Sequence, residues 1–241
     1  MAALARRAGT MGDDIATNIA RVQERMAAAC RRSGRRPEDV RLVAISKTVP
    51  PERIRQAYEA GLRDFGENRV QEAEAKRPAL ADLTITWHLV GHLQTNKARP
   101  ARVLFHWIHS VDSFRLAEKL DQAVACSGER LPVLLEVNLG EEASKSGVRE
   151  ADVMVVAEQV SRLATIEIRG LMVIPPFLDD PARTRPYFRR LRELACQLET
   201  ASLPGVSMHE LSMGMSHDFE VAIEEGATLV RIGTVIFGER G

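Results

Sequence analysis

The chain has 241 residues, and its 33 lysines and arginines balance its 33 aspartates and glutamates, so the formal net charge at pH 7 is zero. No block of like charge is long enough to predict a nucleic-acid or membrane-surface partner, and no apolar run approaches the roughly 20 residues of a membrane span. The cysteines Cys30, Cys126 and Cys196 are too widely spaced for a disulfide framework or a metal motif. We therefore expect a protein of the reducing cytoplasm, without a metal site.

Residues 1–12 are small and basic and lack an apolar core, so we expect a tail rather than a secretory signal. A helix should follow, with Asp13 as its N-cap. Its apolar residues recur at spacings of four, three and four, at Ile15, Ile19, Val22 and Met26. We expect residues 13–241 to form a single domain.

The first strand carries a lysine at its C-terminal end. Leu42–Ile45 is apolar and partly β-branched and is stopped by Pro50, as a buried strand would be. Because side chains alternate along a strand, Lys47 shares a face with Val43 and Ile45. If that face points into a core, partial desolvation lowers the pKa of the Lys47 ammonium and leaves an amine able to attack a carbonyl. The alternative is a solvated lysine at the strand end.

Apolar runs and amphipathic segments then alternate to the end of the chain. Further strands are expected at residues 62–65, 85–90, 107–111, 133–138, 168–174, 208–212 and 229–232. Helices are expected at residues 51–60 and 69–80, after the run 91–98, from Ser113 through Val124, and at residues 152–163, 184–198 and 216–225. Eight such units imply a parallel sheet, and we predict an α/β fold, a single (β/α)8 TIM-type barrel with an extra N-terminal helix. An open doubly wound sheet is the alternative, although no Gly-x-Gly-x-x-Gly follows the first strand.

In such a barrel, functional residues follow the strands, and the loops after strands seven and eight often bind phosphate. The run 211–216 follows the seventh strand and leads into a helix for which Ser216 is the expected N-cap. Gly214 would let the backbone approach a ligand closely. Gly233 and Thr234 follow the eighth strand. Either loop alone is ordinary turn chemistry, but together they predict a phosphate site.

Arg231 lies between apolar neighbours inside the eighth strand, and a buried arginine needs an acceptor. That acceptor is a ring nitrogen or a carboxylate of a ligand, or else Glu210 in a structural ion pair. Lys47, the two loops and Arg231 together describe a site for pyridoxal 5'-phosphate (PLP). The lysine would form an imine with the aldehyde, the loops would hold the phosphate, and the arginine would meet the pyridine nitrogen.

Several short motifs stand in order along the chain, at residues 44–48, 65–68, 87–88, 91–97, 144–147, 169–172, 211–216 and 230–238. As a set they resemble the pyridoxal-phosphate homeostasis family, single-domain relatives of the fold type III barrel of alanine racemases. The resemblance implies an internal aldimine at Lys47 and a ring nitrogen facing Arg231. It implies phosphate contacts from Ser212, Met213, Ser216, Gly233 and Thr234, and ring neighbours at Asn68 and His88. The sequence departs from the family at Val49, where many members have another lysine.

His88 also has a plainer interpretation as a hydrogen-bonded core histidine. For the function, the resemblance favours a non-catalytic carrier that holds PLP and serves vitamin B6 homeostasis as a monomer, with PLP-dependent apoenzymes as recipients. The alternative is a racemase-like PLP enzyme. Racemases take a second base, a tyrosine, from a β-domain of a partner subunit, whereas Tyr58 and Tyr187 here lie in expected helices. An aldolase using Lys47 without a cofactor is a third possibility.

Overall fold

The computed structural model describes residues 14–123, 130–140 and 146–238. The expected tail and the expected cap Asp13 lie outside these residues, as do Val124 and the Ser144-Lys145 part of one motif. The strands are β1 (Arg41–Ile45), β2 (Asp64–Glu67), β3 (Thr86–Leu89), β4 (Trp107–Val111), β5 (Leu131–Asn138), β6 (Val148–Arg149), β7 (Ile166–Met172), β8 (Val206–Met215) and β9 (Leu229–Ile232).

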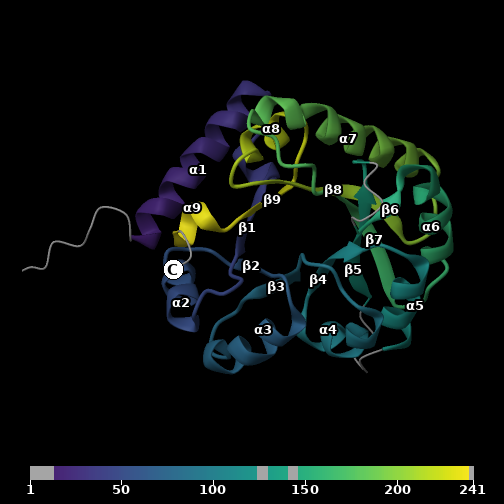
Figure 1. Ribbon diagram of the computed structural model, residues 1–241, viewed down its shortest axis with the longest axis horizontal. Coiled ribbons are helices and arrows are strands. Elements are labelled where there is room, and N and C mark those ends of the chain that lie inside the picture. Colours follow the sequence, from purple (N-terminus) through teal and green to yellow (C-terminus); the bar gives the residue numbers. More distant parts are fainter. Residues whose placement is uncertain (1–13, 124–129, 141–145, 239–241) are drawn as a thin grey trace, which may run out of the picture.

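The α-helices are α1 (Ile15–Arg32), α2 (Pro51–Glu59), α3 (Val70–Lys76), α4 (Ala98–Leu104), α5 (Phe114–Gln122), α6 (Val153–Val160), α7 (Arg185–Thr200), α8 (Phe219–Glu224) and α9 (Thr234–Phe237). Short 3₁₀ helices are η1 (Pro37–Asp39), η2 (Arg77–Leu80), η3 (Thr95–Lys97), η4 (Glu150–Asp152) and η5 (Pro181–Thr184). Helices surround the strands on the outside, and α1 lies beside α8 and α9 (Figure 1).

The strands form a closed parallel barrel. Hydrogen-bonded neighbours follow the order β4-β3-β2-β1-β9-β8-β7-β5, and pairing of β4 with β5 closes the ring. The short β6 pairs with β5 outside the ring. The predicted eight-stranded TIM-type barrel is therefore confirmed, and the open doubly wound alternative is wrong because an open sheet would leave β4 and β5 as unpaired edges.

Two apolar cores flank the strands. The large one lies between barrel and helices and includes Leu42 and Ala44, whereas a small one inside the barrel contains Val43 with Ile45 packed against it. The predicted alternation along β1 is thus confirmed, and Lys47 follows from the inward face. The strands also carry buried polar side chains, among them His88, His109, Ser212 and Arg231, and the candidate site is built around these.

The N-terminal helix α1 lies on the outside of the barrel, between the helix that follows β1 and the two helices that flank β9. Its apolar stripe is buried, and it packs against α2, α8 and α9. The side chain of Asp14 caps it, accepting hydrogen bonds from the backbone N–H groups of Ala16 and Thr17 at 3.3 and 3.2 Å. Because α9 is only one turn long, α1 supplies the cover that a full-length eighth helix would otherwise provide.

Several element boundaries differ from the prediction, and two of these differences have a local explanation. β2 begins at Asp64, not at Leu62, because Gly61 at φ 102° turns the chain and the Leu62 N–H still donates to a carbonyl of α2, that of Ala57. α3 ends at Lys76 and continues as a 3₁₀ helix, because Pro78 cannot donate to the preceding turn. The shift of β2 moves Glu67 from an expected loop into a buried strand position.

Candidate functional site

A cavity of about 810 Å³ opens where the strands end. Six residues predicted for the site line it, namely Lys47, Asn68, Ser216, Arg231, Gly233 and Thr234. The other three predicted residues, His88, Ser212 and Met213, are fully buried and lie outside its lining. The strand ends therefore bring together six residues that lie far apart in the sequence. Contact of His88, Ser212 and Met213 with a ligand stays a prediction.

Met213 and Gly214 face the helices rather than the cavity. Met213 belongs to the large outer core. Gly214 has φ 89°, and a Cβ there would lie 2.5 Å from Cβ of Ala222 and 2.9 Å from Cα of Phe219 in α8. The glycine is therefore required by packing against α8, and the expected close approach of its backbone to a ligand is not supported.

Ser216 is not the cap of a helix, as the sequence had suggested. β8 continues to Met215, residues 216–218 form a turn, and α8 begins only at Phe219. Asp218 stabilises this turn, because its Oδ1 accepts a hydrogen bond from the Met215 N–H at 2.7 Å. The helix N-terminus expected at this end of the cavity is thus replaced by a turn that carries the Ser216 hydroxyl.

Thr234 opens α9, a helix that the sequence did not predict, with Gly233 as its N-cap residue. The backbone N–H groups in the first turn of a helix have no acceptor within the helix. Gly233 has little room for a side chain, since a Cβ would meet the carbonyl oxygen of Ile45 at 3.1 Å. The end of β9 therefore presents backbone donors and one hydroxyl to the cavity.

Arg231 is 4% exposed and reaches the cavity from inside the barrel. One Nη donates to the carbonyl oxygen of Val173 at 2.8 Å and the other to Oγ of Ser212 at 2.6 Å. The expected alternative partner, Glu210, instead pairs with Arg41 and Thr228. The ion pair with Arg231 is therefore wrong, and the guanidinium keeps further N–H donors for a ligand.

Arg231 is the first member of a buried chain of hydrogen bonds, called here the interior chain. Ser212 Oγ lies 2.9 Å from His109 Nδ1, and His109 Nε2 lies 3.0 Å from His88 Nδ1. His88 Nε2 lies 2.9 Å from Oδ1 of Asp64 at the start of β2. The plain interpretation of His88 as a hydrogen-bonded core histidine is confirmed, and it is linked to Arg231 through two intermediates.

The charge states of the two histidines determine which atom donates in each hydrogen bond of the interior chain. Burial lowers the pKa of His88, although Asp64 opposes the shift, and burial together with the charges of its neighbours lowers the pKa of His109 well below its usual value. Both rings are then neutral, so each has one donor and one acceptor nitrogen. With Asp64 accepting, every hydrogen bond runs from Arg231 toward Asp64. Burial lowers the pKa of Arg231 to about 10, which leaves it cationic at neutral pH.

Two functional candidates escaped the sequence analysis. His109 joins the interior chain, and Glu136 lines the cavity while being only 7% exposed. Burial, reinforced by the charge of Asp112 and opposed by that of Arg231, raises the pKa of Glu136 to about 7. Each is the one ionisable side chain of a mostly apolar strand, and this was the available signal. Their inward direction depends on strand register, which the sequence does not display.

Two classes of feature are absent from the part of the chain that the structure describes. Among residues 14–123, 130–140 and 146–238, no cluster of histidine, cysteine and carboxylate side chains could hold a metal ion. Within the same residues, each helix is too short or too polar to cross a membrane.

Comparison with known proteins gives consistent matches. A family model described as the N-terminal domain of alanine racemase matches residues 13–241. The chain is 48% identical over 222 residues to a pyridoxal phosphate homeostasis protein of Aquifex aeolicus, covering 92% of this chain and 96% of that protein. PipY of Synechococcus elongatus, solved with PLP bound, is 44% identical with a TM-score of 0.81, over 93% of this chain and 100% of PipY. An alanine racemase of Corynebacterium glutamicum, 17% identical with a TM-score of 0.68 over 94% of this chain and 61% of the racemase, shares the fold.

Proposed function

The chain belongs to the alanine racemase N-terminal domain family and, within it, to the pyridoxal phosphate homeostasis proteins, and from this premise we propose that it is a PLP carrier. In this proposal it holds PLP covalently on Lys47 and acts in vitamin B6 homeostasis without turnover of its own. It is a cytoplasmic monomer that hands the cofactor to PLP-dependent apoenzymes, with residues 1–12 as a tail and residues 13–241 as one domain.

The observation that carries the proposal is the donor set of one cavity. A primary amine at Lys47, a buried guanidinium at Arg231 and the hydroxyls of Ser216 and Thr234 line the same space. The cavity volume of about 810 Å³ lies within the range of small-molecule sites. These groups fit an aldehyde, a ring nitrogen and a phosphate respectively, so the residues present suit PLP.

Each residue has a distinct task in this proposal. PLP, when bound, supplies an aldehyde for reversible attachment to an amine and a ring that accepts electrons. Lys47 provides the amine. Thr234, Ser216 and backbone N–H groups near Gly233 hold the phosphate. Arg231 donates a hydrogen bond to the ring nitrogen and, being a cation itself, disfavours protonation there, which weakens the ring as an electron sink.

The alternative is a racemase-like PLP enzyme. Such an enzyme needs a second base facing Lys47, and Tyr58 and Tyr187 lie in α2 and α7, outside the cavity lining. Glu136 is the observation that keeps this alternative testable, since it is a titratable carboxyl in the cavity wall. Incubating the PLP-loaded protein with single amino acids and resolving the enantiomers tests it. We expect no sustained racemisation or decarboxylation, and many turnovers per site would overturn the carrier proposal.

The covalent attachment is tested on the purified protein. We expect a visible absorption band with PLP, and we expect borohydride to fix the cofactor on Lys47 in peptide mapping. Lys47→Ala should abolish the band while the protein stays folded. Lys119→Ala, which removes a lysine of α5 outside the cavity lining, serves as the matched control and should keep the band. A band that survives Lys47→Ala would contradict the proposal, and an aldolase without cofactor would show no band at all.

A further inference from the structure

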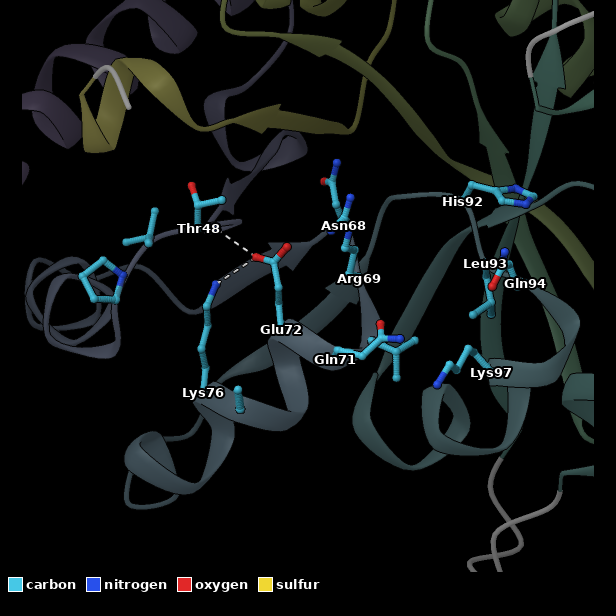
Figure 2. A pocket seen from close by; sticks show the side chains of 14 residues that line it. Thr48, Asn68, Arg69, Gln71, Glu72, Lys76, His92, Leu93, Gln94 and Lys97 are labelled. Carbon is cyan, nitrogen blue, oxygen red and sulfur yellow. Dashed lines mark hydrogen bonds and ion pairs between the residues drawn. The ribbon is translucent and has the colours of Figure 1, made fainter. Parts of the chain in front are cut away.

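The two peptide groups on either side of Lys47 are both held by side chains of one helix. The Ser46 carbonyl oxygen, which precedes Lys47, accepts a hydrogen bond from Nζ of Lys76 at 2.7 Å. The Thr48 N–H, which follows Lys47, donates to Oε2 of Glu72 at 2.8 Å. Figure 2 shows Glu72 and Lys76 side by side on α3 below Thr48. The backbone of Lys47 is thus held by a side-chain hydrogen bond on each side of its Cα.

The two gripping side chains are also tied to each other and to the barrel. Glu72 and Lys76 are one helical turn apart, and their charged groups lie 3.4 Å apart. Lys76 also donates to Oε1 of Glu67 at 2.8 Å, an oxygen that accepts from Oγ of Ser46 at 2.7 Å. Burial raises the pKa of Glu67, and the nearby Lys76 opposes this rise. The unit formed by Glu72, Lys76 and Glu67 is called here the α3 clamp.

The α3 clamp binds a backbone segment whose conformation is unfavourable for a residue with a Cβ. Thr48 has φ 63°, in the left-handed region that residues with a Cβ rarely occupy. Its N–H is the group bound by Glu72. Although burial acts in the opposite sense, the Thr48 N–H and Lys76 lower the pKa of Glu72, so the acceptor is ionised at neutral pH. The left-handed turn directly after Lys47 is therefore held by a charge-assisted hydrogen bond.

Stability alone does not account for this arrangement. The side chains of Lys76 and Glu67 are 10% and 0% exposed, and an ion pair this deep is commonly no more stabilising than apolar residues of similar size. Glu72 and Lys76 also line an open groove of about 880 Å³ that shares Thr48 and Asn68 with the site cavity. The largely buried charged unit therefore meets the open groove at Glu72, whose side chain is 24% exposed, next to the lysine.

Resting on the proposed function, we propose that Glu72 and Lys76 are positioning residues that aim Lys47 at the aldehyde of its ligand. They touch neither ligand nor reacting atoms in this assignment. Their effect falls on covalent attachment and leaves recognition of ring and phosphate unchanged. This separates a positioning role from a structural one, because general damage to the barrel would weaken every ligand of the cavity.

The test compares two ligands on apo protein. PLP carries the aldehyde, whereas pyridoxamine phosphate carries the same ring and phosphate without it. We expect Glu72→Ala to weaken PLP about tenfold, as loss of a charged hydrogen bond implies, and to leave pyridoxamine phosphate unchanged. Glu72→Gln keeps an oxygen for the Thr48 N–H and should lose less. Glu74→Gln, an exposed carboxylate of the same helix, is the matched control. Lys76→Met is a second variant, read with circular dichroism as a folding control.

Each outcome decides the matter. A loss confined to PLP, with borohydride fixation at Lys47 reduced in parallel, supports positioning. Equal losses for both ligands, or no loss in Glu72→Ala, overturn it. If the wild-type protein itself is not fixed at Lys47, the proposed function fails and this inference fails with it. If the wild-type protein is fixed at Lys47 and Glu72→Ala keeps its affinity for PLP, only this inference fails.

Discussion

The two walls of the cavity hold their key side chains by opposite means. On the arginine side, Arg231 is anchored by the interior chain, whose two histidines are neutral and fully buried. On the lysine side, the backbone of Lys47 is held by Glu72 and Lys76, which are charged and border an open groove. One wall is a series of hydrogen bonds through two neutral histidines, with a guanidinium at one end and a carboxylate at the other. The other wall is a set of ion pairs that is largely buried and meets an open groove at Glu72.

This difference suits the proposed PLP carrier, which would have to retain its ligand and also release it. A pyridine ring that is held by the buried, pre-organised Arg231 remains oriented whether or not the covalent bond is made. A lysine aimed from the solvent edge stays within reach of a second amine that takes the ligand over. The comparison therefore assigns retention to the arginine side and exchange to the lysine side, and the following predictions test that division.

The largest effect should come from the phosphate. Each charge-assisted hydrogen bond contributes on the order of 1.5–3 kcal/mol, so losing two of them weakens binding at least about a hundredfold. Pyridoxal, which offers Lys47 the same aldehyde without phosphate, should therefore bind at least about a hundredfold more weakly than PLP. Titration of apo protein with both compounds measures this. Equal affinities would show that the loops carrying Ser216 and Thr234 are ordinary turns.

Substitution of Gly233 should reproduce that loss within the protein. Gly233→Val adds a side chain whose Cβ lies 3.1 Å from the Ile45 carbonyl oxygen, so either the loop or the phosphate has to shift. Gly140→Val is the matched control, since its Cβ would meet nothing closer than 3.7 Å, an ordinary contact with Pro176. We expect PLP affinity to fall in the first variant and to hold in the second. Normal PLP binding by Gly233→Val would show that the phosphate does not bind at this loop.

The barrel fold and the positions of Lys47 and Arg231 could be predicted because the sequence patterns that indicate them are local. Apolar runs and helical spacing marked the strands and helices, and Lys47 and Arg231 stood out as charges at the end of one apolar strand and inside another. The interior chain was not predictable in this way. Which face of β4 carries His109 depends on its register with β3 and β5, and its contacts with Ser212 and His88 join strands distant in sequence.

Errors at the cavity rim have a similar origin. The hydroxyl after Gly214 suggested a helix cap at Ser216, yet tertiary packing of Gly214 on α8 carries β8 onward to Met215. The clamp residues Glu72 and Lys76 lie within the expected helix 69–80, and the sequence did not single them out. Their role depends on how α3 lies against the loop after β1, which no local pattern specifies.

A smaller effect, of a different kind, should follow from breaking the interior chain. His109→Phe leaves the Ser212 hydroxyl without its acceptor and Nδ1 of His88 without its donor in a buried region, and each such loss costs about 1–3 kcal/mol. We expect a lower free energy of unfolding in urea, and about tenfold weaker binding because Ser212, which accepts a hydrogen bond from Arg231, is no longer held in place by His109. Unlike the clamp variants, this change should weaken PLP and pyridoxamine phosphate equally, since both use the ring nitrogen.

The control for that prediction is His209→Phe, which changes an exposed histidine of β8. It should leave both affinities and the free energy of unfolding unchanged. If His109→Phe instead weakened PLP alone, the arginine side would be acting on the covalent bond, and the division between the two walls would be wrong.

The smallest effect should come from Glu136, which lines the cavity. Changing its charge tests whether a negative charge in the cavity wall weakens ligand binding. With a pKa of about 7, Glu136 is neutral at pH 5.5 and ionised at pH 8.5. An ionised carboxylate repels an anionic phosphate, so PLP binding should weaken as pH rises through 7. Glu136→Gln stays neutral throughout. Because the phosphate titrates identically with both proteins, the ratio of their dissociation constants isolates this residue.

We expect that ratio, wild type over Glu136→Gln, to rise from about one at pH 5.5 to about three at pH 8.5. By linkage, an anion that binds next to Glu136 raises its pKa further, so binding near pH 7 should take up protons in the wild-type protein and fewer in the variant. Calorimetry in buffers of different ionisation enthalpy measures that uptake. A ratio that stays constant across this pH range would mean that Glu136 does not face the phosphate-bearing ligand.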